Sequence, residues 1–186
     1  GDWGLPPDVH TRDAAEFDRL RQYAEQLHAD VIAIQEVDGQ TVAARLFPPA
    51  LYSIHMTHDD VVQRVGIVVR RGMPYDVNPD VTALDVDPHE HLRSGADITL
   101  HLADGPLRIL AVHLKTGCHD GSLRRRGRNS CAELREQIPP LQAWIAARQR
   151  EGVPFIVLGD FNRHMDRKDH LWSALLRSSP LINSTE

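Results

Sequence analysis

Residues 155–162 read Phe-Ile-Val-Leu-Gly-Asp-Phe-Asn, and this stretch carries most of the information about the fold. It begins as a short apolar run after the turn residues Glu-Gly-Val-Pro at 151–154, a pattern typical of a buried strand. The run ends in Asp160 and Asn162, where a strand used only for packing would simply turn. The stretch therefore predicts a buried strand over residues 153–158 that presents a carboxylate and an amide at its carboxyl end.

Two other apolar runs have the same design. Residues 31–34 (Val-Ile-Ala-Ile) are followed by Gln-Glu, and residues 109–112 (Ile-Leu-Ala-Val) are followed by His-Leu-Lys. In α/β sheets, functional side chains collect at the carboxyl ends of strands, where rigid backbone aims them into a shared crevice. We therefore expect four polar side chains to converge there, namely Glu36, His113, Asp160 and Asn162.

The rest of the chain alternates between helical and extended patterns. Apolar residues recur at three and four positions over residues 11–28, where Asp13 and Glu16 have capping-box spacing. A second helical pattern covers residues 131–150, and we expect Pro139-Pro140 to kink or divide it. Further elements are predicted as strands at 51–56, 61–70, 96–102 and 107–114, a hairpin turn at 103–106, and a last helix at 170–177. The sum predicts a layered α/β domain with mixed, largely antiparallel sheets.

Length and composition set limits on the function. The chain has 186 residues, 41% hydrophobic and 25% charged, which fits one globular domain. No apolar run approaches the roughly 18 residues that a membrane-spanning helix needs. The net charge of -5 argues against a protein that holds nucleic acid mainly through a broad basic surface, but it does not exclude an enzyme that acts on phosphates.

The chain has two cysteines, Cys118 and Cys131, which flank a segment rich in glycine and arginine. A disulfide between them would stabilise that loop by about 3 kcal/mol, and it would indicate a secreted or periplasmic protein. The alternative is two free thiols in a cytoplasmic protein. The chain begins with Gly1 rather than Met and shows no signal peptide, so we expect a processed or incomplete chain.

The converging side chains are suited to a hard divalent cation. Glu36 and Asp160 offer oxygen ligands, and the lack of a Cys/His cluster favours Mg²⁺ or Mn²⁺ over zinc. His113 and Asn162 are placed to bond phosphoryl oxygens or to move protons. The chemistry that this set predicts is metal-assisted hydrolysis of a phosphoester.

Three motifs in this order, VIAIQE at 31–36, AVHLK at 111–115 and IVLGDFN at 156–162, resemble the endonuclease/exonuclease/phosphatase superfamily of deoxyribonuclease I-like proteins. The resemblance implies a four-layer α/β/β/α sandwich of two mixed, largely antiparallel sheets, with the site at one edge between them. It implies that Glu36 is the metal-binding glutamate and that Asp160 orients or activates the attacking water. Asn162 matches the phosphate-binding asparagine, and His113 matches the histidine of the deoxyribonuclease I and sphingomyelinase branches.

Two further residues are candidates for binding substrate. Arg93, in the sequence Leu-Arg-Ser-Gly at 92–95, resembles the family's substrate-phosphate arginine, and Lys115 could neutralise phosphate. Simpler roles remain open for both: Arg93 could pair with Asp97 or Glu90, and Lys115 could extend along the surface. The arginines at 124, 125, 126 and 128 form either a solvated loop or a grip on a nucleic-acid backbone.

The chain departs from the family pattern at both ends. Members of the family begin with a strand that carries an asparagine and end with a strand that carries Ser-Asp-His, and neither motif occurs here in a matching place. Asp169-His170 lies too close to Asn162 to be the second motif. We therefore expect a single domain over residues 1–186 that lacks the first and last family strands, either because the functional protein is longer or because this is a degenerate relative.

The function that these observations favour is a Mg²⁺-dependent phosphodiesterase, a nuclease acting on DNA or RNA. One alternative is a non-catalytic relative that binds nucleic acid or a protein. Another keeps the chemistry but changes the substrate to a phospholipid or an inositol phosphate.

For Asp160 and Asn162 the simpler alternative is a pair that shapes a turn. The sequence makes no prediction of oligomeric state.

Overall fold

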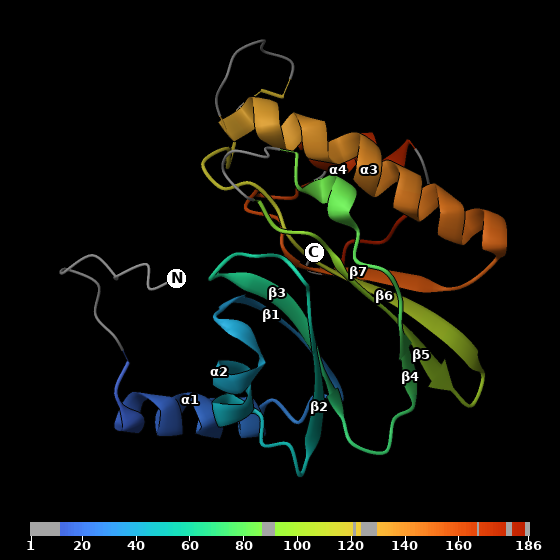
Figure 1. The fold of residues 1–186 in the computed structure, drawn as a ribbon. Helices are drawn as coiled ribbons and strands as arrows, with labels where there is room; N and C mark the ends of the chain where they lie inside the picture. Colours follow the sequence, from blue (N-terminus) through green and yellow to red (C-terminus); the bar gives the residue numbers. More distant parts are fainter. Residues whose placement is uncertain are drawn as a thin grey trace.

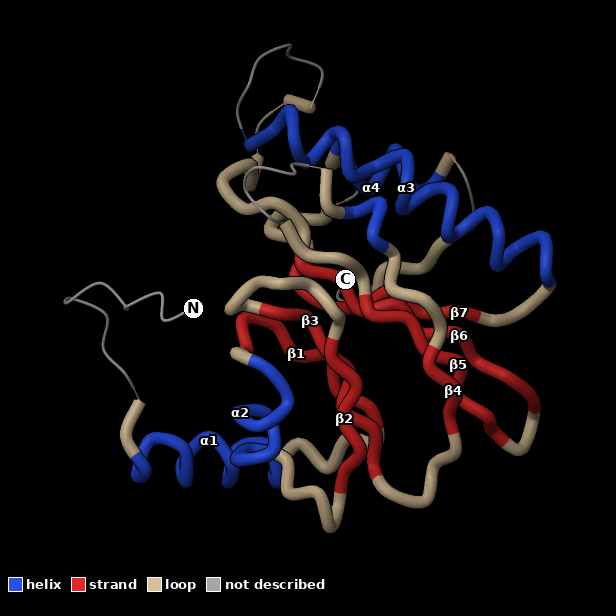
Figure 2. The backbone as a smooth tube through the Cα atoms, in the orientation of Figure 1, coloured by secondary structure: helices blue, strands red, loops and turns tan. Residues whose placement is uncertain are grey.

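The computed structural model describes residues 12–86, 92–120, 122–123, 130–166, 168–177 and 180–184. Its two sheets pack face to face, and helices cover the outer face of each sheet (Figure 1). The order of layers is therefore α/β/β/α, as expected. Figure 2 shows the strands of both sheets between the two helical layers.

The first half of the chain forms the first pair of layers. Helix α1 (Ala14–Gln26) begins at a capping box, in which the Asp13 carboxylate accepts the Glu16 N–H at 2.8 Å and the Glu16 carboxylate accepts the Asp13 N–H at 2.9 Å. The elements that follow are β1 (Val31–Val37), α2 (Gly39–Leu46), β2 (Tyr52–Met56) and β3 (Arg64–Arg70). The sheet has the order β1-β3-β2 and is antiparallel throughout.

The second half forms the other pair of layers. Its elements are β4 (Tyr75–Val77), the 3-10 helix η1 (Thr82–Leu84), β5 (Ala96–Leu102), β6 (Gly105–His113), α3 (Ser130–Glu151), β7 (Phe155–Asp160) and α4 (His170–Leu176). The sheet order is β4-β5-β6-β7, and β5 and β6 form the predicted hairpin, with Leu102 opposite Gly105. Among the described strands, β6 and β7 alone pair in parallel, and α3 lies in the connection between them.

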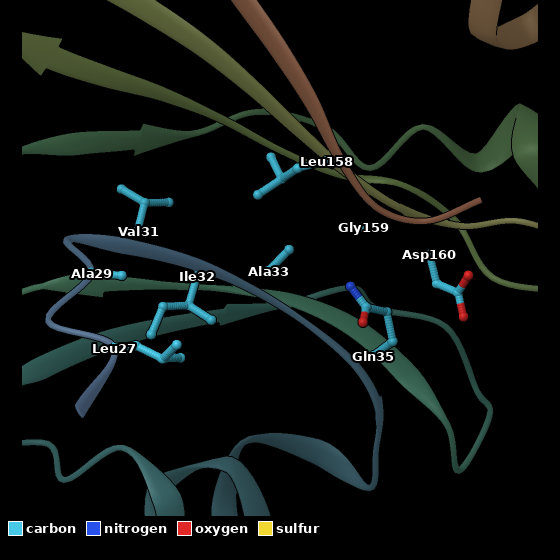
Figure 3. Close-up of a pocket in the computed structure, with 9 residues that line it drawn as sticks. All are labelled: Leu27, Ala29, Val31, Ile32, Ala33, Gln35, Leu158, Gly159 and Asp160. Carbon is cyan, nitrogen blue, oxygen red and sulfur yellow. The ribbon is translucent and has the colours of Figure 1, made fainter. Parts of the chain in front are cut away.

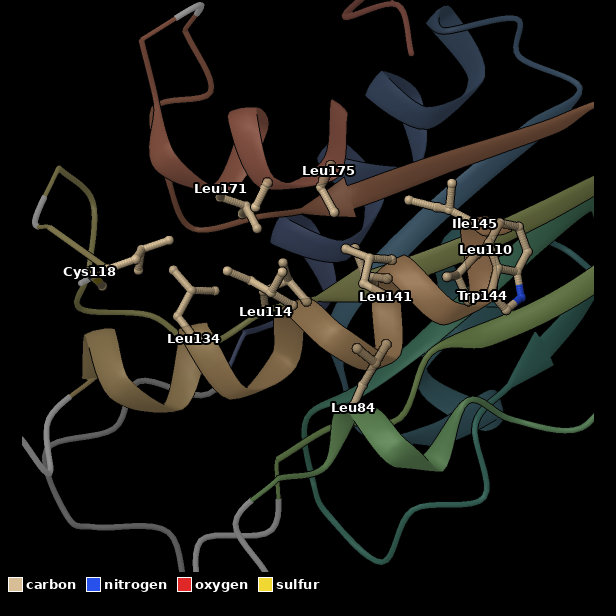
Figure 4. Close-up of a cluster of buried hydrophobic side chains, with 14 residues drawn as sticks. Leu84, Leu110, Leu114, Cys118, Leu134, Leu141, Trp144, Ile145, Leu171 and Leu175 are labelled. Atoms are coloured by element: carbon tan, nitrogen blue, oxygen red, sulfur yellow. The ribbon is translucent and has the colours of Figure 1, made fainter. Parts of the chain in front are cut away.

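Three apolar cores separate the four layers, and the alternation of side chains along the strands fills them. Val65, Ile67 and Val69 of β3 point between the sheets, whereas Val68 packs toward α1 and α2. The third core joins the second sheet to α3 and α4. Figure 4 shows part of it, including Leu134, Leu141, Trp144 and Ile145 of α3, Leu110 of β6, and Leu171 and Leu175 of α4.

Helix α3 excludes one of the two effects expected of Pro139-Pro140, division of the helix, while the kink stays a prediction. It runs unbroken from Ser130 to Glu151 with Pro139 and Pro140 inside it, so the prolines do not divide it. Leu134 and Leu141, on either side of the prolines, are fully buried, and this packing holds both halves of the helix on one face of the sheet. Tertiary contacts therefore outweigh the local preference of proline to end a helix.

Cys118 and Cys131 form the disulfide, which joins the loop after β6 to the first turn of α3. The arginines at 124, 125, 126 and 128 and Glu90 lie outside the described residues. Within the described ranges, no helix is long and apolar enough to cross a membrane.

Candidate active site

The parallel pair β6 and β7 places His113 beside Asp160. The two strands run in register from Arg108 opposite Phe155 to His113 opposite Asp160. Because parallel strands end at the same edge of a sheet, an imidazole and a carboxylate lie side by side at that edge. These two predicted site residues are therefore brought together by the backbone.

Alternation along the two strands also sets the direction of both side chains. In β6, Ile109 and Ala111 pack between the sheets, so His113, two residues further on, shares their face. In β7, Leu158 packs against the same core, and Asp160 follows it at the same spacing. Both groups therefore lie on the side that faces the first sheet.

Glu36 reaches this region from the first sheet through a bulge in β1. The register of β1 against β3 shifts between Ile34 and Val37, and Glu36 has a φ of 57°. In a regular strand Glu36 would share the helix-facing side of Ile34, but a bulge redirects a side chain. The Glu36 carboxylate is exposed, and its charge acts on His113.

Other predicted site residues act electrostatically on His113. Burial is the main cause that lowers its pKa below the ordinary histidine value, because a buried charge is poorly solvated, and the positive charge of Arg93 lowers it further. The charges of Asp160 and Glu36 oppose this and raise the pKa. His113 is only 8% exposed, and its Nδ1 has no hydrogen-bond partner among the described residues. One imidazole thus lies within electrostatic reach of two carboxylates and a guanidinium.

The loop after β7 is fixed by its own polar groups. The Asn162 N–H donates to Asp160 Oδ1 at 2.7 Å, and Asn162 Nδ2 donates to the carbonyl of Leu114 at 2.9 Å. The first of these bonds is the turn that the simpler interpretation expected. Together the two bonds use one carboxylate oxygen of Asp160 and one N–H of the Asn162 side-chain amide, which is compatible with a chemical role for the other oxygen and the other amide N–H.

The disulfide loop braces the same segment. Arg163, whose side chain is 2% exposed, donates to the carbonyl of Cys118 at 2.7 Å and to the carboxylate of Asp169 at 2.5 Å. Asp169 in turn caps the start of α4. His119 Nδ1 donates to the carbonyl of Asn162 at 3.1 Å. The loops after β6 and β7 are therefore fastened to each other beyond the strand ends.

Arg93 lies in the turn before β5. Its Nε–H donates to the carbonyl of Gln63 at 3.0 Å, and Nη2 donates to Gln63 Oε1 at 2.6 Å. The simpler pairing with Asp97 does not occur, because the Asp97 carboxylate is buried and bonded to other groups, namely Arg108, Trp144 and Asn78. The sequence analysis missed Gln63, since no pattern links it to a residue thirty positions away.

Lys115 points toward the second helical layer. Its Nζ lies 2.6 Å from Glu133 of α3, and its backbone N–H donates to Gln137 Oε1 at 2.8 Å. The structure thus groups His113, Asp160, Glu36 and Arg93, and it places the ammonium of Lys115 against α3.

A groove runs beside the site along the open edges of β1 and β7. It has a volume of about 560 Å³ and is lined by Leu27, Ala29, Val31, Ile32, Ala33, Gln35, Leu158, Gly159 and Asp160. In Figure 3, Gln35 and Asp160 lie toward one end and Val31 and Leu27 toward the other. The groove is therefore polar next to the site and apolar beyond it.

The donor set of the site fits Mg²⁺ better than a transition metal. No cluster of three or more His, Cys, Asp or Glu side chains that could hold a metal occurs within the described part of the chain. Magnesium does not need such a cluster, since it is usually held by one or two carboxylates together with water and substrate phosphate. Glu36 and Asp160, both exposed, offer the two carboxylates.

Two sheets stacked between helical layers, with polar groups gathered at one edge, define a deoxyribonuclease I-like α/β fold. The profile of the Endonuclease/Exonuclease/phosphatase family matches residues 8–181, and the chain belongs to that family. Its members are generally hydrolytic phosphoesterases.

Solved structures with the same fold differ widely in sequence from this chain. TDP2 from C. elegans is 17% identical with a TM-score of 0.54, over 81% of this chain and 44% of that one. D. rerio TDP2 in complex with a single strand DNA product is 16% identical with a TM-score of 0.56, over 86% and 56%. A β-hairpin deletion mutant of beta toxin from Staphylococcus aureus is 12% identical with a TM-score of 0.55, over 88% and 64%.

The chain spans between 44% and 64% of the length of these three structures. A search of curated proteins finds no match.

Proposed function

We propose that this protein is a Mg²⁺-dependent phosphodiesterase that hydrolyses nucleic acid. The observation that carries the proposal is the parallel register of β6 and β7, which sets His113 opposite Asp160 at the strand ends. The charges of Arg93, Asp160 and Glu36 act on this imidazole. Two carboxylates for a cation, a guanidinium for a phosphate and an imidazole for proton transfer are the groups that phosphodiester hydrolysis requires.

Each side chain has a proposed role. Glu36 and Asp160 would hold Mg²⁺ or Mn²⁺, which when bound offsets the negative charge that develops on the phosphoryl group. Asp160 orients the attacking water, and the second N–H of the Asn162 amide donates to a phosphoryl oxygen. His113 holds or transfers a proton, and Arg93 binds the substrate phosphate. Lys115, whose Nζ lies 2.6 Å from Glu133, takes no direct part in this proposal.

Nucleic acid is the favoured substrate among phosphodiesters. The fold accommodates a nucleic-acid strand in D. rerio TDP2, whose structure contains a single strand DNA product. Only 5% of the residues of this chain are aromatic, which is few for a surface that inserts into lipid. The disulfide favours a secreted or periplasmic location, where nucleic acid in the surroundings would be the target.

The open edges of β1 and β7 are places where further strands could extend the two sheets. Neither edge has a second strand partner among the described residues, and both border the site. We propose that these are the positions at which the first and last strands of the family would add to the two sheets.

The test is cleavage of plasmid DNA, RNA and short oligonucleotides by the full chain with Mg²⁺, with Mn²⁺ and with EDTA. We expect cleavage that EDTA abolishes, and we expect Glu36→Ala and Asp160→Ala each to lower kcat/KM by about 100-fold or more. Glu25→Ala, on the exposed surface of α1, is the matched control and should keep full activity.

Three results would overturn the proposal. Turnover unchanged by Glu36→Ala and Asp160→Ala would remove these residues from the chemistry. The protein could also bind the metal and cleave no nucleic acid but hydrolyse a phospholipid or an inositol phosphate. That result would show that the substrate is not nucleic acid. Binding of DNA without turnover would favour the non-catalytic alternative.

A further inference from the structure

The turn that carries Arg93 is held by the loop between β2 and β3. Gln63, at the end of that loop, accepts two hydrogen bonds from Arg93, one at its backbone carbonyl from Nε–H (3.0 Å) and one at Oε1 from Nη2 (2.6 Å). Gln63 is therefore the main described support of this guanidinium.

The two bonds occupy one side of the guanidinium and leave its other end available. A guanidinium has five N–H donors in a planar fork, and Nε with Nη2 form its lateral edge. Because Gln63 takes that edge, the N–H pair at the end of the group remains for an anion, in the geometry that arginine uses for phosphate. The effect of the Arg93 charge on His113 places this group within reach of the site.

A second contact fixes the next residue of the turn. Asp59 accepts the N–H of Ser94 at 3.0 Å and its hydroxyl at 2.6 Å, and Ser94 is 2% exposed. The loop itself is fastened at its start, where the N–H and Nδ1 of His58 each lie 2.8 Å from Asp80 Oδ2. The loop of residues 57–63 is therefore a braced support on which the Arg93 turn rests.

We propose that Gln63 is a positioning residue that presents Arg93 to a phosphate group of the substrate, with Asp59 holding the turn in place. The inference deepens the proposed function and rests on it for the identity of the substrate. A free arginine side chain loses much rotamer freedom when it binds an anion. If Gln63 restricts the Arg93 side chain before the substrate binds, this loss of side-chain entropy no longer weakens substrate binding.

The kinetic test compares Gln63→Ala with the wild type on bis(para-nitrophenyl) phosphate and Mg²⁺. We expect KM to rise about 3- to 10-fold, the effect of losing one ordinary hydrogen bond, here from Arg93 Nη2 to Gln63 Oε1, while kcat stays within about 2-fold. Val62→Ala is the matched control, because Val62 lies in the same loop and is 50% exposed. It should leave both constants unchanged.

A second measurement does not depend on turnover. In ¹⁵N NMR spectra, the Nη2 protons of Arg93 should give a slowly exchanging signal in the wild type and in Val62→Ala, assigned by its loss in Arg93→Lys. This group donates to the Gln63 side chain, whereas Nε–H donates to the backbone carbonyl, which an alanine keeps. In Gln63→Ala the signal should broaden or vanish, and the affinity for inorganic phosphate should fall by the same factor as KM rises.

The outcomes separate this inference from the proposed function. If the wild type binds phosphate through Arg93 but cleaves no phosphodiester, the proposed function fails and the positioning role of Gln63 stands. If Gln63→Ala keeps the Arg93 signal and the phosphate affinity of the wild type, the inference fails. If Arg93→Lys leaves phosphate affinity unchanged, the inference fails as well.

Discussion

Glu36 and Asn162 are two of only three non-glycine residues with positive φ in the described part of the chain, the third being His28. This backbone conformation costs a side chain about 1 kcal/mol or more, and such strain tends to occur at functional sites. The strain at Glu36 belongs to the bulge that brings its carboxylate toward His113.

Replacing Glu36 with glycine should therefore separate stability from activity. Glycine adopts positive φ freely, so relief of strain offsets the greater entropy of the unfolded chain, and we expect the free energy of unfolding to change by less than about 1 kcal/mol. Gln35→Gly, at a neighbouring position without positive φ, should lose about 1 kcal/mol. Urea denaturation of both variants measures this, and a larger loss for Glu36→Gly than for Gln35→Gly would contradict it.

His113 should make stability depend on pH. An imidazole whose pKa is lower in the folded than in the unfolded protein binds fewer protons when folded, so stability rises with pH and the penalty disappears above the unfolded value of about 6.5. His113→Asn removes this penalty. We expect the wild type to lose stability relative to His113→Asn between pH 7.5 and 5.5, as measured by urea denaturation at both pH values. Equal losses in the two proteins would show that His113 titrates normally.

Sequence reasoning located the strand-end residues because each follows an apolar run directly. Asp160 and His113 could be paired in advance, since parallel strands share an edge. The partner of Arg93 could not be predicted. The bond to Gln63 depends on how a loop of one sheet meets a turn of the other, which is a property of tertiary packing.

At the scale of elements, Gly159 leaves no room for a side chain between β7 and β6. This residue has a φ of 125°, and a Cβ there would lie 2.1 Å from the carbonyl oxygen of Val112 and 2.9 Å from its nitrogen. Backbone atoms cannot move aside as a flexible side chain can. The glycine is therefore required by the pairing that sets His113 beside Asp160.

Gly159→Ala should accordingly lower the free energy of unfolding by about 3 kcal/mol or more and abolish activity. Gly152→Ala is the matched control, because Gly152 also has positive φ but nothing lies within 4 Å of its added Cβ. It should cost only about 1 kcal/mol for the backbone strain. Thermal or urea unfolding compares the two, and similar losses would mean that the close approach to Val112 is unimportant.

The elements that the sequence predicted are those with a local signal. The capping box of α1, the hairpin of β5 and β6, and α4 are encoded by neighbouring residues. Helix α2 and strand β4 were missed, since α2 is short and β4 has only three residues held by pairing with β5. Both acquire their structure from the sheets around them.

For the whole molecule, β1 and β7 are edge strands of the two sheets, as are β2 and β4, and the edges of β1 and β7 border the site. Unpaired strand edges expose N–H and C=O groups that can pair with another chain. Ile156 of β7 is 47% exposed and adds an apolar side chain to this edge. The described surface thus offers both hydrogen bonds and apolar contact along one side.

We expect the 186-residue chain to self-associate in a concentration-dependent way through this side. Ile156→Lys should reduce the association, because a lysine on an edge strand opposes pairing. Leu176→Lys, at a 40% exposed position on α4, is the control and should have no effect. Sedimentation velocity over a range of concentrations tests this, and an equal response to both substitutions would point to a different surface.

The connection through α3 also determines at which stage of folding the site forms. All strands of the β1–β3 and β4–β6 pairings lie before Leu114 in the chain, whereas β7 can join β6 only after the segment from Leu114 to Pro154 has been synthesised and has folded back. Contacts between distant residues form late, since the chain entropy of closing a long loop must be overcome first. His113 and Asp160 meet at the far end of that last pairing. A nascent chain would thus acquire most of its sheet structure while still chemically inert, and catalytic competence would arise only as folding is completed.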